Sequence, residues 1–547
     1  MAHDVRRPEA APAADGILSG GRTLVRALAG HGVTQVFGIP GTHNLEIYRH
    51  LTAYGIRHVT PRHEQGAGYA ADGYARVTGR PGVVLTTTGP ALLNAAAAVG
   101  QAYSDSVPLL VVSPGMPLRH PRLSTGLLHE MRSQTEALRG VAAFSHRVSS
   151  VAEIETALAR AFTLFRAGRP RPAHIEIPLD LLDATEALGP VRLAPPLPRA
   201  TPDPHAVRRA ARTLTAARRP ALLLGGGARD AGSACLSLAE RLAAPVVTTA
   251  NGKGIVPETH PLSLGVALHS PGVQKWLTAR DVVIAVGTEL AESDFWSPPP
   301  ALDGTLVRID IDAAQMYGET PADLALVGDA RTTVKALLAE IPAARQDGHH
   351  ARVPAEVAAL RGARDAGTAA RDARWIPYLK AIRSVLADDA IITSDSAQCC
   401  YYGALPHLPL SPHGRFLHPT GFGTLGYALP AAIGARTAAP DRQVLALSGD
   451  GGLQFTVQEL ATAVQLQLPL PIVVFDNGGY GEIRAEMAAR GDTPTAVDFP
   501  PVDLPALARA YGGHGTRACT ADELSRAVAE ALDTPGPTLI TVPEETS

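Results

Sequence analysis

Two polar turns separated by 24 residues constrain this chain more than any other feature of its sequence. The first turn is the Gly-Asp-Gly sequence of residues 449–451, and the second is the Asp-Asn pair at 476–477. Short apolar runs typical of buried strands precede them at 443–448 and 470–475, while 453–466 carries apolar residues at helical spacing. The pattern predicts strand, turn, helix, strand and turn, with both turns at the carboxyl edge of a parallel sheet, where α/β folds bind ligands.

The residue types in these turns suit a metal ion and a diphosphate. Asp450 and Asn477 offer one charged and one neutral oxygen, which fits a Mg²⁺ ion that takes its other ligands from water and phosphate. The glycines let backbone N–H groups approach phosphate oxygens closely. Because Asp-Gly is a very common turn dipeptide, two unconnected turns remain the alternative for this stretch alone.

The bulk composition excludes several classes of protein. A chain of 547 residues suggests about three or four domains. The net charge of −3 provides no basic surface, so nucleic acid and membranes are not expected partners. The four cysteines have no metal-binding spacing, and the adjacent pair Cys399 and Cys400 is expected to be reduced, which favours a cytoplasmic location. No apolar run approaches the roughly 20 residues of a membrane span, and residues 1–17 are predicted to be a disordered tail.

Alternating strand and helix patterns divide the rest of the chain into three blocks, which cover residues 18–185, 204–345 and 373–544. A Pro- and Ala-rich linker at 186–203 separates the first two blocks, and 346–372 is either a second linker or a surface helix. Alternation of this kind predicts α/β domains with doubly wound parallel sheets. We therefore expect three such domains of similar size.

Five stretches are similar, in the same order, to the acetolactate synthase branch of the thiamine-diphosphate-dependent 2-oxo acid enzymes. They are residues 37–41, 62–66, 87–90, 423–434 and 449–451. The resemblance implies an N-terminal domain that binds the pyrimidine of the cofactor, a central domain, and a C-terminal domain that binds its diphosphate and Mg²⁺. In the family the second turn is Asn-Asn and its second Asn binds the metal, so Asp476 is a departure that leaves Asn477 available.

The resemblance also assigns roles to single residues. Glu64 would bind the aminopyrimidine, so that the exocyclic amine of the cofactor can act as a base, although an acid at a helix N-terminus is its ordinary structural role. Leu425 would wedge the cofactor into a bent shape, and Asp450, Asn477 and the Gly479 carbonyl would hold Mg²⁺. The cofactor-binding residues that it implies are Pro40, Glu64, Gly89, Asn94, Gln398, Gly423, Thr424, Leu425, Gly449, Asp450, Gly451, Gly452, Asn477, Gly479, Tyr480 and Gly481.

Two departures from the synthases bear on the reaction. His129 stands where they carry a glutamine, and it is either a proton donor in catalysis or a polar residue with purely structural partners. Glu482 stands where they carry an apolar residue, although a carboxylate that faces a buried pocket is costly unless it is paired or functional. Glu482 would bind a cationic group of the substrate, move a proton during decarboxylation, or pair internally with Arg484 or another basic residue.

The central block, residues 204–345, also departs from the synthases by carrying additional acidic residues. Flavin-binding synthases carry an arginine-containing turn where this chain has Glu289, Glu292 and Asp294, so FAD is allowed but not favoured. The glycines at 225–227 lack the dinucleotide pattern and are interpreted as a plain turn. With residues 41–44, these departures most resemble the bacterial 5-guanidino-2-oxopentanoate (2-ketoarginine) decarboxylases.

The function predicted from the sequence is therefore non-oxidative decarboxylation of a 2-oxo acid, with 5-guanidino-2-oxopentanoate giving 4-guanidinobutanal and CO₂. The alternative enzyme class is carboligation of 2-oxo acids, as in acetolactate synthase. A non-enzymatic paralogue is disfavoured because Glu64 and the metal ligands are present. The resemblance also implies a homodimer or homotetramer with the active site between subunits.

Overall fold

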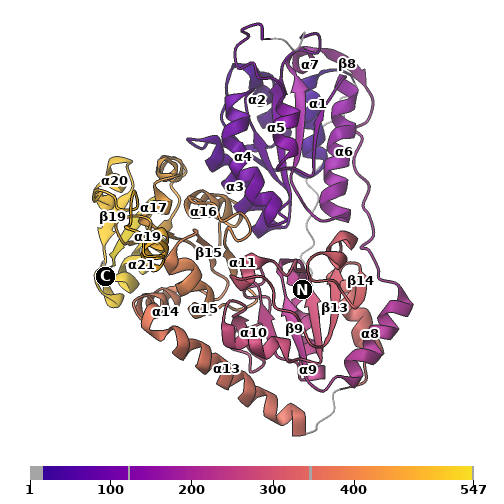
Figure 1. Cartoon of the computed structure of the whole chain (residues 1–547). Coiled ribbons are helices and arrows are strands. Elements are labelled where there is room, and N and C mark those ends of the chain that lie inside the picture. The colour runs from indigo at the N-terminus through magenta and orange to yellow at the C-terminus, as the bar shows by residue number, and fades with distance from the viewer. Residues whose placement is uncertain (1–15, 121–123, 344–347, 545–547) are drawn as a thin grey trace. The chain divides into compact units, whose positions relative to one another are not determined.

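The computed structural model describes residues 16–120, 124–343 and 348–544, and the chain divides into two compact units at Leu197 and Pro198. The first unit contains one six-stranded sheet and the second contains two (Figure 1). All strand pairs within these three sheets are parallel, and helices follow most strands. The predicted class of three parallel-sheet α/β domains is confirmed.

The sheet of the first unit has the order β3-β2-β4-β5-β7-β6. Its strands are β2 (Gln35–Gly38), β3 (Arg57–Val59), β4 (Gly82–Leu85), β5 (Leu109–Gly115), β6 (Phe144–Arg147) and β7 (Ala173–Pro178). The main helices of this unit are α1 (Gly20–Gly30), α2 (Leu45–Leu51), α3 (Glu64–Thr78), α4 (Pro90–Ser104), α5 (Gln134–Arg139), α6 (Val151–Ala167) and α7 (Leu179–Asp183). The winding direction reverses between β2 and β4, which puts a ligand crevice outside their carboxyl ends.

A small strand pair departs from the sequence prediction. Strand β1 (Gly16–Ser19) pairs antiparallel with β8 (Thr185–Leu188). Residues 16–17 were predicted to belong to the tail and 186–188 to the linker, and neither pattern indicates a strand because each is short and pairs only with the other. The rest of the predicted tail, residues 1–15, lies outside the described part of the chain.

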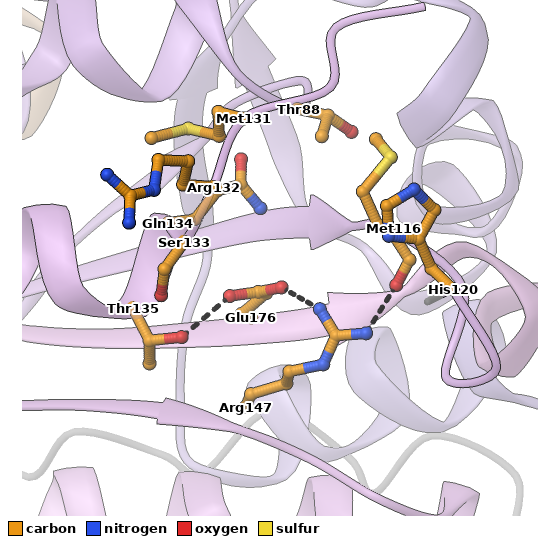
Figure 2. A pocket seen from close by; sticks show the side chains of 10 residues that line it. All are labelled: Thr88, Met116, His120, Met131, Arg132, Ser133, Gln134, Thr135, Arg147 and Glu176. Carbon is orange, nitrogen blue, oxygen red and sulfur yellow. Dashed lines mark hydrogen bonds and ion pairs between the residues drawn. The ribbon is translucent and has the colours of Figure 1, made fainter. Parts of the chain in front are cut away.

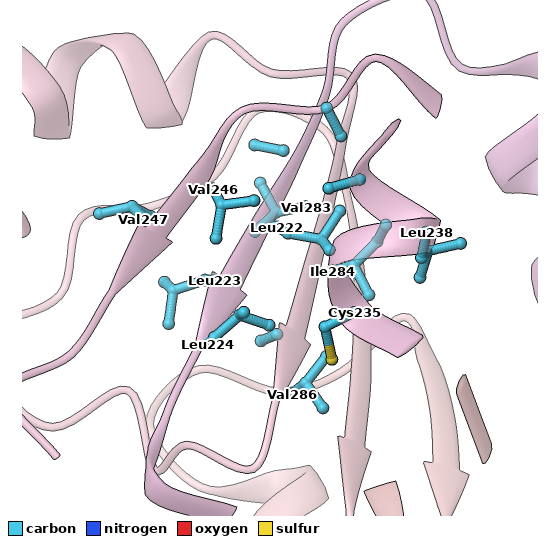
Figure 3. Close-up of a cluster of buried hydrophobic side chains, with 14 of the residues drawn as sticks. Leu222, Leu223, Leu224, Cys235, Leu238, Val246, Val247, Val283, Ile284 and Val286 are labelled. Atoms are coloured by element: carbon cyan, nitrogen blue, oxygen red, sulfur yellow. The ribbon is translucent and has the colours of Figure 1, made fainter. Parts of the chain in front are cut away.

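The central sheet of the second unit has the order β11-β10-β9-β12-β13-β14. Its strands are β9 (Pro220–Leu224), β10 (Val246–Thr248), β11 (Ser263–Val266), β12 (Val282–Val286), β13 (Thr305–Asp310) and β14 (Leu324–Val327), and its helices include α8 (Pro204–Ala216), α9 (Gly232–Leu242), α10 (Pro271–Thr278), α11 (Glu292–Phe295) and α12 (Ala330–Glu340). Figure 3 shows the apolar core between β9, β12 and α9, where Leu222, Ile284 and Leu238 are fully buried. Strands buried on both faces explain the uninterrupted apolar runs of this block.

The C-terminal sheet has the order β16-β15-β17-β18-β20-β19, with its reversal between β15 and β17. Its strands are β15 (Ile391–Ser394), β16 (Arg415–Leu417), β17 (Val444–Gly449), β18 (Leu470–Asp476), β19 (His514–Arg517) and β20 (Pro537–Pro543). The helices of this domain include α14 (Ile376–Val385), α15 (Leu405–His407), α16 (Ala428–Ala438), α17 (Asp450–Leu453), α18 (Leu460–Gln465), α19 (Gly481–Ala489), α20 (Leu504–Ala510) and α21 (Ala521–Asp533).

Two segments of the second unit refine the sequence prediction. Residues 453–466 were predicted as one helix, but α17 and α18 are separate, because the Thr456 hydroxyl donates to the Gly426 carbonyl at 2.7 Å and turns the chain between them. Most of 346–372 forms the helix α13 (Gly348–Asp372), the surface-helix alternative (Figure 1). Its Glu356 accepts from the Trp276 indole at 2.6 Å and so ties the helix to the central domain.

In each six-stranded sheet the strand order reverses at one place, the switch point, and the three switch points differ in the groups that they present to a ligand. In the central domain, the turns after β9 and β12 close on each other, since Gly227 N donates to Gly287 O at 3.0 Å and Gly287 has a φ of +58°. The glycines at 225–227 therefore allow this close packing, which agrees with their interpretation as a plain turn. The switch points of the first and third sheets carry the predicted site residues.

Candidate active site

The two polar turns that open the sequence argument meet at the switch point of the C-terminal sheet. Asn477 N donates to Asp450 Oδ1 at 3.2 Å, so the residues after β17 and β18 are in contact. Asp450 is only 9% exposed. Burial, with a smaller contribution from the Asp476 carboxylate, raises the pKa of Asp450 to about 6. Of the residues that the structure describes, none forms an ion pair that neutralises this carboxylate.

The oxygens around Asp450 fit a magnesium ion. Asn477 Oδ1 is buried without a hydrogen-bond partner, and a buried carbonyl oxygen without a partner is unfavourable unless a ligand completes it. The Gly479 carbonyl oxygen also faces this turn, since it would lie 3.2 Å from a Cβ atom on Gly451. One carboxylate, one amide and one backbone carbonyl are hard oxygen donors of the kind that Mg²⁺ prefers. Within the described ranges, no group of three or more His, Cys, Asp or Glu side chains could hold a metal.

The glycines of the first turn are needed for close packing. A Cβ atom on Gly451 would lie 3.1 Å from the Tyr480 ring, and one on Gly452 would lie 3.0 Å from Asp395 Oδ2. Gly451 and Gly452 therefore let this turn pack against Tyr480 and Asp395 more closely than residues with a Cβ atom could. The structure brings Gly449, Asp450, Gly451, Gly452, Asn477, Gly479, Tyr480 and Gly481 together, as the sequence predicts.

Asp395 is a residue of this region that the sequence argument missed. It follows β15, is buried, and accepts from Gly426 N at 3.0 Å and from the Ser448 hydroxyl at 3.1 Å. Burial raises the pKa of Asp395 to about 6. It therefore joins the turn of residues 423–426, which carries Leu425, to the end of β17. The available signal was a carboxylate directly after a short strand, since Asp395 follows β15 as Asp450 follows β17.

Glu482, at the start of α19, has partners different from those expected. Its Oε2 accepts from the Gln398 amide at 2.8 Å, and its Oε1 accepts from the Tyr402 hydroxyl at 2.7 Å. Arg484 instead pairs with Asp498 at 2.6 Å. The alternative in which Glu482 pairs internally with Arg484 is therefore wrong, because the two side chains leave the helix in different directions.

The first unit holds a second group of predicted residues. Glu64 is the first residue of α3, and its Oε2 accepts from the Asn94 amide on α4 at 2.9 Å. Pro40 lies in the turn after β2, which Asn44 supports by accepting from Gly41 N at 2.8 Å. Pro40 after β2 and Asn94 on the helix after β4 flank the switch point of this sheet, and Glu64, which follows the edge strand β3, reaches it through Asn94. Glu64, Asn94 and Pro40 therefore lie where a parallel sheet binds ligands.

The loop with His129 packs directly on Gly89. A Cβ atom on Gly89 would lie 2.5 Å from the His129 carbonyl oxygen, and Gly89 has a φ of +68°. His129 has a φ of +62°, and its buried Nδ1 has no hydrogen-bond partner among the residues that the structure describes. Its ring lies 5.1 Å from that of His43, whose pKa is lowered by burial and by His129. The open ring nitrogen argues against the interpretation of His129 as a residue with satisfied structural partners.

A small cavity lies behind this loop (Figure 2). Gln134, on its wall, accepts from Gly89 N at 2.7 Å and donates to Pro114 O at 2.7 Å, which holds the turn after β4. Among the described residues that line the cavity, the one acid is Glu176, which accepts from the Arg147 guanidinium and from the Thr135 hydroxyl at 3.0 Å. Arg147 therefore compensates the charge of Glu176, and Arg132 adds a second guanidinium to the wall of the cavity. Gln134 had no sequence signal, since its partners are distant in the chain.

Comparison with known proteins matches this arrangement of domains. Three family models cover residues 18–137, 207–337 and 397–542, as the N-terminal TPP binding domain, the central domain and the C-terminal TPP binding domain of thiamine pyrophosphate enzymes. The chain belongs to this family of thiamine-diphosphate-dependent enzymes. The sequence prediction of the family is confirmed.

Individual relatives cover nearly the whole chain. The "Probable 2-ketoarginine decarboxylase AruI" of Pseudomonas aeruginosa is 44% identical over 96% of this chain and 93% of its own. The acetolactate synthase isozyme 3 large subunit of Escherichia coli is 32% identical over 94% and 92% of the two chains. The acetolactate synthase large subunit of Parasynechococcus marenigrum is 33% identical over 96% and 87%. The family thus includes both decarboxylases and carboligases among the relatives of this chain.

Proposed function

We propose that this enzyme decarboxylates 5-guanidino-2-oxopentanoate without oxidation. The bond between the carboxylate carbon and the oxo carbon breaks, CO₂ leaves, and a proton takes its place on the former oxo carbon to give 4-guanidinobutanal. Thiamine diphosphate, when bound, supplies the carbon nucleophile and the electron sink that this bond cleavage requires. The residues of the chain bind, orient and move protons around it.

The observation that carries the proposal is the carboxylate of Glu482. In the described part of the chain, no cationic side chain lies within ion-pair distance of it, and three neutral donors, Gln398, Tyr401 and Tyr402, hold it in place. A guanidinium is always charged and binds carboxylates in bidentate geometry. The 44% identity to a relative named as a probable 2-ketoarginine decarboxylase supports the same substrate.

Two residues of the first unit receive catalytic roles in this proposal. Glu64 holds the aminopyrimidine through its carboxylate, while Asn94 fixes that carboxylate by donating to Oε2. His129 supplies the proton that replaces the carboxylate group, and its free buried Nδ1 supports this role. General acid catalysis by such a group contributes about 10²- to 10⁴-fold.

The remaining parts of the proposal concern the metal, the assembly and the location. Asp450, Asn477 and the Gly479 carbonyl would hold Mg²⁺, which neutralises the diphosphate. The active site would form between subunits of a homodimer or homotetramer, as the family resemblance implies. The enzyme would be cytoplasmic. In the structure, no helix of the described ranges is long and apolar enough to cross a membrane.

The test is a product assay on the protein reconstituted with thiamine diphosphate and Mg²⁺. We expect 4-guanidinobutanal and CO₂ from 5-guanidino-2-oxopentanoate, and little or no acetolactate from pyruvate. The carboligase alternative rests on the relatives named acetolactate synthase. Acetolactate from pyruvate, without aldehyde from the guanidino acid, would establish that alternative and overturn the proposal.

A further inference from the structure

Three aromatic rings lie beside Glu482 in the second unit. Tyr401 and Tyr402 follow β15 and pack edge to face, with ring centroids 4.6 Å apart. Trp296, which ends α11 of the central domain, lies 5.0 Å from the Tyr402 ring and 6.1 Å from the Tyr401 ring. Burial and the neighbouring Glu482 carboxylate raise the pKa of both tyrosines, which keeps their hydroxyls protonated as donors. The carboxylate thus stands among neutral aromatic groups.

Trp296 has a conformation that apolar burial does not explain. Its φ is +56°, in the left-handed region that large residues avoid, and it remains 42% exposed. His269 stacks on the indole with centroids 4.3 Å apart and an interplanar angle of 22°. Strained backbone that presents an exposed aromatic ring is more typical of a binding site than of a core.

The arginines nearest to this cluster already have acidic partners. Arg371 binds Asp372 at 2.6 Å while its guanidinium lies 3.8 Å from the centre of the Tyr402 ring. Arg374 lies 3.7 Å from Glu544. Among the described residues, Glu482 therefore has no cationic side chain paired with it, whereas one face of the Tyr402 ring already holds the Arg371 guanidinium.

The hydrogen bonds of Glu482 leave one acceptor position for a ligand. The two carboxylate oxygens have four lone pairs, and the Gln398 amide, the Tyr402 hydroxyl and the Tyr401 hydroxyl use three of them. The remaining lone pair can accept one N–H of a guanidinium in a charge-assisted hydrogen bond. The aromatic rings add cation–π attraction to a planar delocalised cation.

We propose that Trp296, Tyr401, Tyr402 and Glu482 form the site that recognises the guanidinium end of the substrate, with the carboxylate as the charged partner and the rings as its walls. This inference rests on the proposed function in assuming that the substrate enters beside Glu482. It goes further because it names the side chains that select a guanidinium over a neutral group of the same shape. These side chains come from the central and C-terminal domains of the second unit.

The test is calorimetric titration of the full-length protein, reconstituted with thiamine diphosphate and Mg²⁺, with two unreactive probes. The probes are 4-guanidinobutanoate and its neutral isostere 4-ureidobutanoate. We expect the native protein to prefer the guanidino probe by about 10- to 100-fold. Glu482→Gln should reduce this preference to about threefold or less, while Glu486→Gln, one turn further along α19 and exposed, should retain it.

Trp296 provides an independent readout. The chain has three tryptophans, and Trp276 and Trp375 are buried, so a ligand beside Trp296 should change the fluorescence of this residue alone. We expect the guanidino probe to change the emission of the native protein and not that of Trp296→Leu. That variant should bind the guanidino probe about 2- to 10-fold more weakly and the ureido probe unchanged. Trp296→Phe, which keeps a ring, should recover most of the affinity.

The outcomes separate this inference from the proposed function. If the native protein decarboxylates the guanidino acid but Glu482→Gln keeps the preference for the guanidino probe, the recognition site is wrong and the function stands. If the native protein binds neither probe preferentially and releases no aldehyde, both are wrong. If Glu482→Gln loses turnover but keeps the preference, its carboxylate moves a proton and does not select the substrate.

Discussion

At the scale of single residues, the buried acids beside the glycine turns determine how the protein responds to pH and metal. Asp450 has an ordinary pKa of 3.8 and a folded-state pKa of about 6. Between these values the folded chain holds a proton that the unfolded chain has lost, so stability falls as the pH rises through this window. Above pH 6 the buried charge of Asp450 lowers the free energy of unfolding by its full amount, which is at most about 3 kcal/mol. A cation bound to Asp450 would remove this loss of stability.

The variant Asp450→Asn tests this cost. Without metal at pH 7.5, its melting temperature should exceed that of the native protein by a few degrees, because a neutral amide replaces a buried charge. The difference should narrow as the pH is lowered toward 4, where the native carboxyl also becomes protonated. Thermal unfolding over this range is the measurement, with the exposed Asp441→Asn as the control.

The same variant should separate stability from cofactor binding. Saturating thiamine diphosphate and Mg²⁺ should raise the melting temperature of the native protein, since a ligand at 100 times its Kd adds about 2.7 kcal/mol. Asp450→Asn should show little of this rise. A variant that is less stable than the native protein at every pH, or that keeps the full response to Mg²⁺, would contradict the assignment of Asp450 as a metal ligand.

At the scale of elements, the turn after β4 holds the loop that carries His129. Gly89→Ala should disturb that loop in two ways: the new Cβ meets the His129 carbonyl at 2.5 Å, and the φ of +68° is unfavourable for alanine. Gly55→Ala is a matched control, because Gly55 has the same φ of +68° and nothing within 4 Å of its Cβ position. Both changes should cost about 1 kcal/mol in backbone conformation.

Only Gly89→Ala should also lose activity, by about 100-fold, because a displacement on the order of 1 Å in a catalytic loop has that effect. Thermal unfolding measures the shared backbone cost, and steady-state kinetics measures the difference between the variants. Equal activities of Gly89→Ala and Gly55→Ala would show that the position of His129 does not matter for turnover.

The sequence predicts the elements better than the contacts between them. Alternating apolar runs identify the three parallel sheets, and polar turns after β17 and β18 locate the candidate metal site, because both signals are local. Tyr402 could not be found in this way, since it meets Glu482 across 80 residues. Nor could Gln134, which reaches Gly89 across 45. Such contacts depend on the packing of whole domains, which periodicity does not encode.

At the scale of the whole molecule, the predicted residues fall into two separate sets. Glu64, Asn94 and His129 belong to the first unit, whereas Asp450 and Asn477 belong to the second. In the proposed function, thiamine diphosphate would use both sets, one for its pyrimidine and one for its diphosphate. The resemblance to the family predicts that the two sets come from different subunits of a homo-oligomer.

This arrangement can be tested by mixing two inactive variants. Glu64→Gln removes the carboxylate for the pyrimidine, and Asp450→Asn removes the metal ligand, so neither protein alone should be active. If each site joins the first unit of one chain to the second unit of another, a mixed dimer carries one site with both defects and one with neither. Random reassembly makes half of the dimers mixed, so about a quarter of the native activity should return.

The reassembly must be carried out under conditions that exchange subunits, with the oligomeric state measured by light scattering before and after. Sites formed within one chain would each keep one defect, and no activity would return, which would reject the intersubunit arrangement. A mixture of the Glu64→Gln and His129→Ala proteins is the control, because both substitutions lie in the first unit. That mixture should stay inactive, since every site receives its first unit from a chain with one of these defects.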